Sequence, residues 1–105
     1  MKHKTLKEWS DICHENAVVK GFWDPRMYFN GSRNTGEILM LVVTELAEAM
    51  EAHRKSDHEN FKEEIADTFI RLFDLCGGLD INIEKEINKK CAKNKKRPYK
   101  HGKIC

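Results

Sequence analysis

Two pairs of acidic residues, each with a spacing of three, are the part of this sequence best suited to chemistry. The first pair is Glu45 and Glu48, which begins two residues after the end of the apolar run of residues 38–43. The second pair is Glu64 and Asp67, which lies beside the apolar sequence FIRLF. A spacing of three places both side chains of a pair on one face of a helix. Four carboxylates brought together repel one another, and a hard divalent cation removes that cost.

The two acidic pairs are expected to meet at one height on neighbouring helices. Residues 56–58 read SDH, a turn so short that the flanking helices should pack antiparallel. Glu48 lies about eight residues before this turn and Glu64 about seven after it, so both lie about 10 Å from the bend. Oxygen ligands are preferred by Mg²⁺, with Mn²⁺ as a substitute. The sequence therefore predicts a metal site at Glu45, Glu48, Glu64 and Asp67.

The composition of this acidic group narrows the choice of metal. No His or Cys belongs to it, which argues against zinc and against di-iron bundles, where a Glu-x-x-His pair is expected. The alternative interpretation is a solvated acidic face, because E-x-x-E is common on surface helices. Two pairs at matched height, the second within a narrow polar stripe between apolar flanks, favour the metal site.

A second group of polar residues lies near the C-terminus. Lys90, Asn94 and Arg97 have spacings of four and three, which place them on one helix face. An arginine can clamp a phosphate with two hydrogen bonds, a lysine adds a point charge and an asparagine a polar group. Beside a divalent metal, such residues are typical of sites that bind and hydrolyse polyphosphates. The alternative is a solvated basic helix end, stabilised by the helix dipole.

Residues 22–34, FWDPRMYFNGSRN, are expected to form a long loop, because they contain Pro25 and Gly31. The loop carries an unusual number of aromatic residues, namely Phe22, Trp23, Tyr28 and Phe29. These side chains could stack on a nucleobase. They could equally fill the core or contact another subunit, and those two interpretations are the simpler ones.

The elements that must position these groups are predicted to be four helices, at about residues 5–19, 35–55, 58–76 and 80–96. The first begins at a capping box, Thr5 with Glu8, and ends at Gly21. The third is expected to stop at Gly77-Gly78, and the fourth before Pro98. No segment shows the alternation of a strand. The predicted fold class is all-α, with four helices and a central antiparallel hairpin made by the second and third.

The composition is that of a globular protein, and residues 1–105 are expected to form a single domain. Hydrophobic residues are 40% and charged residues 34% of the chain, whose net charge is +2. No apolar run has the length of a membrane span, and the N-terminal sequence has no signal-peptide pattern, so a cytoplasmic location is the default. The four cysteines are scattered without a disulfide or zinc pattern and are expected to be reduced.

Taken together, the acidic and basic groups resemble the signature of a known family. The pattern E-x-x-E, fifteen residues, E-x-x-D at 45–67 is similar to the metal-binding motif of the all-α nucleoside triphosphate pyrophosphatases, the MazG and dimeric dUTPase superfamily. The pattern K-x-x-x-N-x-x-R at 90–97 resembles that superfamily's C-terminal phosphate-binding motif. The resemblance covers about residues 35–103 and is closest to the small, single-domain MazG-like proteins, whose ends also read RPYKHGK.

The resemblance implies an enzyme that hydrolyses an NTP or dNTP to the monophosphate and pyrophosphate, in nucleotide-pool sanitation or dNTP control. It implies that Mg²⁺ grips the phosphates and activates a water while held by Glu45, Glu48, Glu64 and Asp67. It also implies that the polyphosphate is held by Lys90, Asn94 and Arg97. The base for the attacking water would be one of the four carboxylates, or Glu63 or Glu37 nearby.

The resemblance further implies a homodimer or homotetramer, because family members assemble through the helical core with the active site near the subunit interface. The third predicted helix agrees with this, since it is apolar over more of its surface than one hairpin partner can cover. The sequence departs from many MazG domains at Thr44, where they carry a further Glu directly before the first motif. The motif therefore does not fix the number of metal ions.

Two other classes of function stay open on the sequence alone. One is a non-catalytic helical oligomerisation or regulatory module, whose carboxylates only solvate a face. The other is a nucleic-acid-binding protein that uses residues 85–103, which contain nine basic residues and one acidic residue. The net charge of only +2 and the lack of a recognised nucleic-acid motif count against the second.

Overall fold

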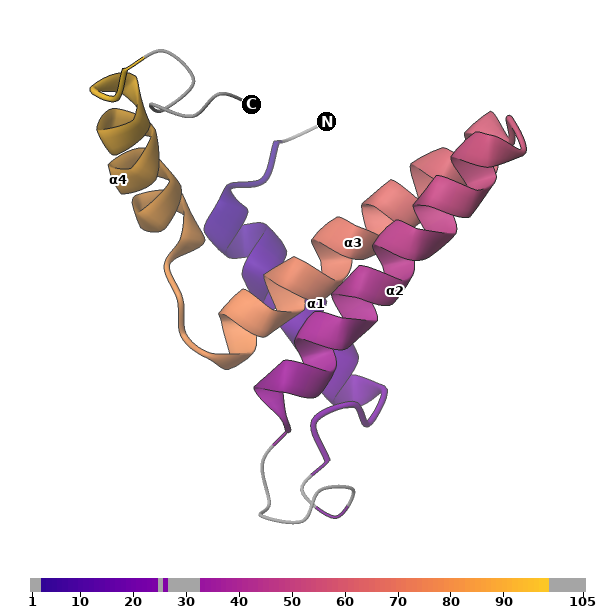
Figure 1. The fold of residues 1–105 in the computed structure, drawn as a ribbon. Coiled ribbons are helices and arrows are strands. Elements are labelled where there is room, and N and C mark those ends of the chain that lie inside the picture. The colour runs from indigo at the N-terminus through magenta and orange to yellow at the C-terminus, as the bar shows by residue number, and fades with distance from the viewer. Residues whose placement is uncertain (1–2, 25, 27–32, 99–105) are drawn as a thin grey trace.

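The structure is a computed structural model that describes residues 3–24, 26 and 33–98. Its four α-helices are α1 (Leu6–Val19), α2 (Thr35–Arg54), α3 (His58–Gly78) and α4 (Ile83–Lys95). The prediction of an all-α fold with four helices is confirmed (Figure 1). Among the described helices, none is long and apolar enough to cross a bilayer.

Side chains that accept backbone hydrogen bonds decide where the helices begin. At α1, Thr5 Oγ1 accepts from the Glu8 N–H at 3.1 Å, and the Glu8 carboxylate accepts from the Thr5 N–H at 3.1 Å. This is the predicted capping box. At α2, α3 and α4, the backbone N–H of the third helical residue likewise donates to a side-chain oxygen. The acceptors are Asn34, Asp57 and Asn82, respectively. The start of α4 is later than predicted because Asp80 has a φ of 55°, which a continuing right-handed helix excludes.

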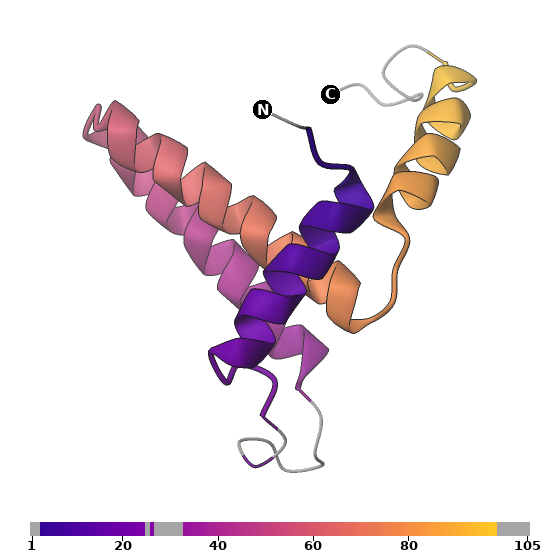
Figure 2. The same ribbon diagram turned by 180° about the vertical axis from the view of Figure 1, so that it is seen from behind.

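The three larger helices form the body of the molecule. As predicted, α2 and α3 form an antiparallel hairpin, and α1 packs across α3 (Figures 1 and 2). The fourth helix contacts α1 and diverges from the hairpin, so that it stands apart from both long helices (Figures 1 and 2). The single-chain fold thus positions α2 and α3 firmly against each other, but not α4 against either.

The buried core is small for the number of apolar residues in the chain. Among its larger side chains only Ile38 is fully buried in the described part of the structure. By contrast, α2 carries a stripe of apolar side chains that are 45–51% exposed, namely Leu39, Val43, Leu46 and Met50. Spacings of four and three place them on one side of the helix, and we call them the exposed apolar stripe. On α3, Phe69 is also 56% exposed.

The prediction that the third helix stops at Gly77-Gly78 is confirmed, because α3 ends at Gly78. Both glycines also serve close packing. A Cβ on Gly78 would overlap the ring of Trp23. A Cβ on Gly77 would lie 2.8 Å from the carbonyl oxygen of Ser10 and 2.6 Å from the Cβ of His14. The absence of a side chain at these two positions lets α3 approach α1 and the residues that follow it.

We expect Gly77→Ala to lower the free energy of unfolding by about 1–3 kcal/mol, although alanine is the better helix former. The reason is that the added methyl group meets backbone of α1, which cannot move without separating the helices. Chemical denaturation measures the change. Gly36→Ala is the control, since its Cβ would meet only the side-chain oxygen of Asn34, at 3.1 Å, and should cost less. Equal stability of the Gly77 variant and the wild type would contradict the close helix contact.

Candidate metal and active site

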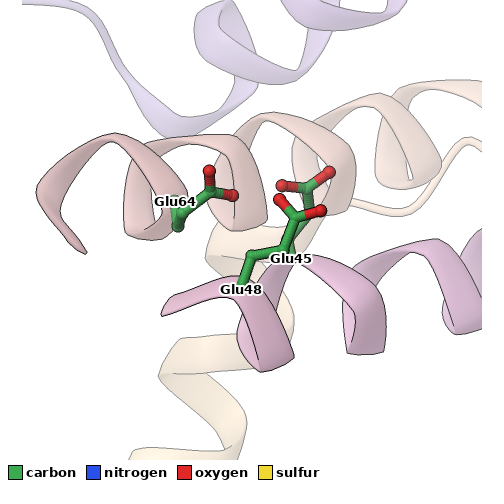
Figure 3. A group of neighbouring side chains, drawn as sticks. All are labelled: Glu45, Glu48 and Glu64. Atoms are coloured by element: carbon green, nitrogen blue, oxygen red, sulfur yellow. The ribbon is translucent and has the colours of Figure 1, made fainter. Parts of the chain in front are cut away.

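Three glutamates converge between the two helices of the hairpin. Glu45 and Glu48 project from α2 and Glu64 from α3, toward one another (Figure 3). One carboxylate oxygen from each lies within 4.8 Å of the others. Glu45 is buried, Glu64 is half-buried and Glu48 is exposed. The predicted meeting of acidic residues across the hairpin is therefore present for these three, which we call the glutamate cluster.

The glutamate cluster has the donor chemistry of a site for a hard divalent cation. Its oxygens are all carboxylate oxygens, as Mg²⁺ and Mn²⁺ prefer. The Oε2 atom of Glu64 is buried and has no hydrogen-bond partner among the described residues. A buried, unpaired carboxylate oxygen is costly, and the neighbouring negative charges add to the cost. A divalent cation would satisfy this oxygen and neutralise the repulsion, so the residues fit the predicted metal.

The pKa of the Glu64 carboxyl is raised to about 7. The largest cause is the hydrogen bond that its protonated form shares with Glu45, followed by desolvation. Hydrogen bonding to Glu48 and the negative charges of both neighbours raise the pKa further. Near neutral pH a proton is thus held in the cluster, and a cation that binds there would have to displace it.

We expect the affinity for Mn²⁺ to be about tenfold weaker at pH 6 than at pH 8, because proton and metal compete for Glu64. The same group affects stability without metal. The raised pKa of Glu64 contributes stability that is fully present below pH 4.5, the ordinary pKa of this carboxyl. This contribution is lost as the pH rises through about 7. Calorimetry at the two pH values measures the affinity, with Glu59→Gln as a control that keeps the pH dependence, since that side chain is 84% exposed. An affinity independent of pH would contradict the role of Glu64.

Asp67, the fourth predicted metal ligand, is not part of the glutamate cluster. It is exposed, one helical turn beyond Glu64 on α3. Together with Glu45 and Arg71 it lines a cavity of about 310 Å³ that adjoins the cluster. Its role as a metal ligand stays a prediction.

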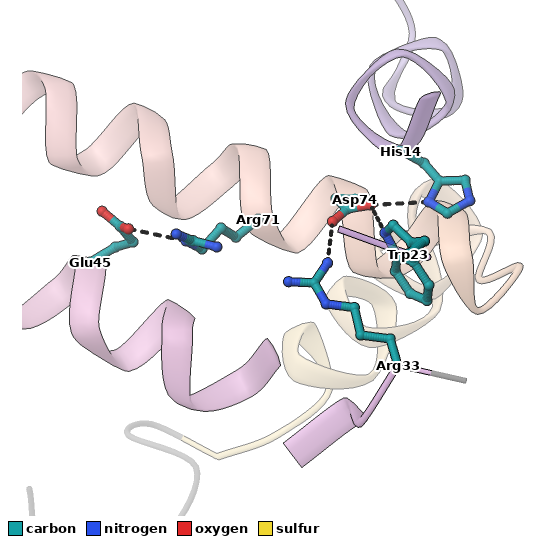
Figure 4. Close-up of polar contacts among 6 residues, drawn as sticks. All are labelled: His14, Trp23, Arg33, Glu45, Arg71 and Asp74. Carbon is teal, nitrogen blue, oxygen red and sulfur yellow. Dashed lines mark hydrogen bonds and ion pairs between the residues drawn. The ribbon is translucent and has the colours of Figure 1, made fainter. Parts of the chain in front are cut away.

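Arg71 binds one member of the glutamate cluster. Its Nε donates a hydrogen bond to Glu45 Oε1 at 3.0 Å, between α3 and α2 (Figure 4). The contact orients Glu45 and offsets part of the negative charge. This partner of Arg71 was not predicted from the sequence. The feature of the sequence that could have indicated this contact is the position of Arg71 one turn after Asp67, on the side of α3 that carries the acidic pair.

A second polar group, centred on Asp74, lies at the other end of the cavity. The Asp74 carboxylate accepts from Trp23 Nε1 at 2.8 Å and from an Arg33 terminal nitrogen at 3.1 Å, and lies 3.0 Å from His14 Nδ1 (Figure 4). The side chains of Arg33 and Asp74 are only 3% and 9% exposed. This arrangement, which we call the Asp74 hub, ties α1 and both ends of the segment between α1 and α2 to α3.

The aromatic residues of the loop have different roles, depending on whether they contact the Asp74 hub. Trp23 is a structural anchor, with its nitrogen on Asp74 and its ring against Gly78, as the core-filling interpretation predicted. Phe22 instead lines the cavity beside the glutamate cluster. The other two loop aromatics, Tyr28 and Phe29, lie outside the described residues.

The predicted phosphate-binding residues are not brought to the glutamate cluster within this chain. Lys90 and Asn94 lie on α4 and Arg97 just beyond its end, and α4 diverges from the hairpin (Figure 1). Lys90 and Arg97 are exposed. Asn94 is half-buried, and its Oδ1 is buried without a hydrogen-bond partner among the described residues. The basic group and the acidic group are therefore separate features of the single chain.

The thiols in the described residues do not belong to the glutamate cluster, although Cys13 lines the adjoining cavity. Cys13 and Cys76 are buried and Cys91 is exposed, and none of them forms a disulfide. Burial raises the pKa of the Cys13 and Cys76 thiols, and for Cys13 the negative charge of Asp74 adds to the effect. Both are thus protonated and unreactive at neutral pH.

Comparison with known proteins adds one finding. Residues 34–101 match a family model described as the MazG nucleotide pyrophosphohydrolase domain. The match covers about two thirds of the chain, from the cap of α2 to beyond the end of α4, and it contains every predicted metal-binding and phosphate-binding residue. No curated protein and no solved structure matches the chain.

Proposed function

Because the chain belongs to the MazG nucleotide pyrophosphohydrolase family, we propose that it is a single-domain, Mg²⁺-dependent enzyme that hydrolyses an NTP or dNTP to the monophosphate and pyrophosphate. The observation that carries this proposal is the convergence of Glu45, Glu48 and Glu64 across the hairpin. A cluster of carboxylates with an unpaired oxygen is a poor structural element but a suitable cation site. We infer a role in nucleotide-pool sanitation or dNTP control.

In the proposed reaction, different residues of the chain bind the cation, orient its ligands and accept a proton. A bound divalent cation neutralises charge on the phosphate oxygens and activates water. Glu45, Glu48 and Glu64 would hold the cation, and Arg71 orients Glu45 through its 3.0 Å hydrogen bond. Water adds to phosphorus at the α–β anhydride link, that link breaks, and pyrophosphate leaves. Asp67, which lines the cavity, would either be a further ligand of the cation or accept the proton of the attacking water.

We propose that the substrate's phosphates are held by Lys90, Asn94 and Arg97 of a second copy of the chain, within a homo-oligomer. Two observations support this. In one chain α4 diverges from the glutamate cluster (Figure 1). The exposed apolar stripe of α2 also leaves a large hydrophobic area for another subunit to cover. Such an assembly would supply the positive charge that the single-chain site lacks, and would offset charge on the departing pyrophosphate.

Mixing two inactive variants tests whether the site is shared between subunits. Glu64→Gln removes part of the cation site and Arg97→Ala removes a phosphate contact. If the two groups come from different chains of a dimer, equal mixing with subunit exchange should restore about a quarter of wild-type activity, because half of the dimers are mixed and each contains one intact site. Each variant incubated alone is the control. No recovery after proven exchange would contradict the shared site.

The proposed activity is tested with the standard NTPs and dNTPs together with dUTP and dITP, each with and without Mg²⁺. Chromatography should show monophosphate and pyrophosphate in equal amounts, and only with the divalent cation. Formation of the diphosphate and inorganic phosphate would reject the reaction proposed. No cleavage of any nucleotide would favour the non-catalytic oligomerisation or regulatory module.

A further inference from the structure

The cavity beside the glutamate cluster is the feature of the molecule that the metal site does not explain. Its volume of about 310 Å³ lies within the range of small-molecule sites. Glu45 and Asp67 line it on the side of the cluster. Much of the remaining wall is apolar and comes from Cys13 and Ala17 of α1 and Ile70 of α3. Because Glu45 belongs both to the cluster and to the cavity wall, a ligand with its phosphate chain at the cluster can extend into this cavity.

We propose that this cavity receives the nucleoside of the substrate, with Phe22 as the surface on which the base stacks; this rests on the proposed function. Phe22 lines the cavity, and the guanidinium carbon of Arg33 lies 5.6 Å from the centre of its ring. Arg33 is itself fixed by its bond to Asp74 (Figure 4). The ring is therefore set in place by the Asp74 hub, which lowers the cost of ordering it when a base binds.

The polar groups that face the cavity indicate which bases it would accept. Asn16 of α1 and Lys20, the residue that follows this helix, line it, and their side chains make no hydrogen bond or ion pair in the part of the chain that the structure describes. The Nε of Arg71 donates to Glu45, which leaves the terminal nitrogens of Arg71 to donate to a ligand. Lysine and arginine are donors only. The acidic lining residues are assigned to the metal site or held in the Asp74 hub.

Donors therefore outnumber the acceptors that are available to a base. A base with exocyclic carbonyl oxygens, such as uracil, thymine, guanine or hypoxanthine, satisfies these donors. Adenine, and to a smaller degree cytosine, would instead present amino groups to them, and two facing donors cannot form a hydrogen bond. The cavity thus indicates a substrate whose base carries carbonyl oxygens. Asn16 and Lys20 would select this base by donating hydrogen bonds to those oxygens.

The test compares nucleotides with a ligand that has phosphates but no nucleoside. Calorimetry with the full chain and Mg²⁺ measures binding of inorganic tripolyphosphate and of non-hydrolysable α,β-imido analogues of dUTP, dGTP, dITP, dATP and dCTP. We expect the carbonyl-base analogues to bind about 10- to 100-fold tighter than tripolyphosphate, from stacking and hydrogen bonding together. For the dATP and dCTP analogues, the affinity should exceed that of tripolyphosphate by a smaller factor.

Filling the cavity should remove this difference. Ala17→Phe should reduce the affinity for the carbonyl-base analogues to that for tripolyphosphate, while the affinity for tripolyphosphate itself stays unchanged. Val19→Phe is the matched control, because Val19 is on the same helix and 79% exposed. Circular dichroism checks that both variants fold. Should Ala17→Phe fail to fold, the surface changes Asn16→Ala and Lys20→Met give the same test, since both should reduce the preference among bases without weakening tripolyphosphate binding.

Several results would overturn the cavity assignment. They are equal affinity for nucleotides and tripolyphosphate, a preference for the amino-bearing bases, and variants that leave the base preference intact. The proposed function can fail separately. If no nucleotide is hydrolysed but the analogues show the expected pattern, the cavity assignment stands and the enzymatic proposal falls. If nucleotides are hydrolysed but bind no tighter than tripolyphosphate, the reverse holds.

Discussion

Replacing Glu48 by glutamine should lower the rate of pyrophosphate release on the order of a thousandfold while the protein stays folded. Glu48 contributes one of the three carboxylate oxygens that lie within 4.8 Å of one another. Glutamine keeps the size of the side chain but removes its charge, so the cation loses one of its anionic ligands. Because Glu48 is exposed, the fold should not depend on it.

The matched control is Glu51→Gln, which continues the same spacing of three along α2. Its carboxylate is 53% exposed, pairs with Arg54 and Lys55, and is not a member of the glutamate cluster. Steady-state rates at saturating Mg²⁺ should therefore be near those of the wild type for this variant alone. The assignment of the cluster would be wrong if Glu51→Gln lost as much activity as Glu48→Gln, or if Glu48→Gln kept most of its activity.

The largest effect on stability is expected at Asp74. Asp74→Ala removes the only carboxylate that the described structure places on the buried guanidinium of Arg33, and it also leaves the indole N–H of Trp23 without its partner. An uncompensated buried charge of this kind costs about 3–5 kcal/mol of unfolding free energy. The stability of a small domain is about 5–15 kcal/mol, so the loss would be a large fraction of the total.

Chemical denaturation measures this loss, and a surface ion pair provides the comparison. Asp11→Ala removes a contact with Lys7 between side chains that are 60% and 72% exposed, and should cost less than about 1 kcal/mol. Asp74→Asn should fall between the two, since its amide has one acceptor oxygen for the donors around it. An Asp74→Ala variant as stable as Asp11→Ala would show that the hub does not hold the fold together.

Much of the hairpin and its cluster could be predicted because the signals are local. Capping residues such as Asn34 and Asp57 decide where helices begin through bonds to the third residue of the helix. Helical periodicity then fixes which side chains share a face, and a short turn makes the two helices antiparallel. The convergence of Glu48 and Glu64 follows from these local rules and the helical rise.

The features that sequence reasoning missed depend on contacts between distant residues. Asp74 bonds partners that are 41, 51 and 60 positions away, and no local pattern specifies such pairs. The Gly77-Gly78 pair was predicted as a stop signal but not as a packing site, because sequence alone does not show that α1 packs against Gly77. The place of α4 is decided by even fewer contacts, and so Lys90 and Arg97 could be assigned to one face but not to a site in space.

The central claim is that the glutamate cluster holds a divalent cation, and titration of Mn²⁺ into the metal-free protein at pH 8 tests it most directly. Calorimetry should show saturable binding of at least one ion per chain in the wild type. The same titration of Glu64→Gln should show that this binding is lost or strongly weakened, since the orphaned oxygen of Glu64 is then no longer a carboxylate oxygen. Absence of saturable binding in the wild type, or equal binding in the variant, would contradict the account.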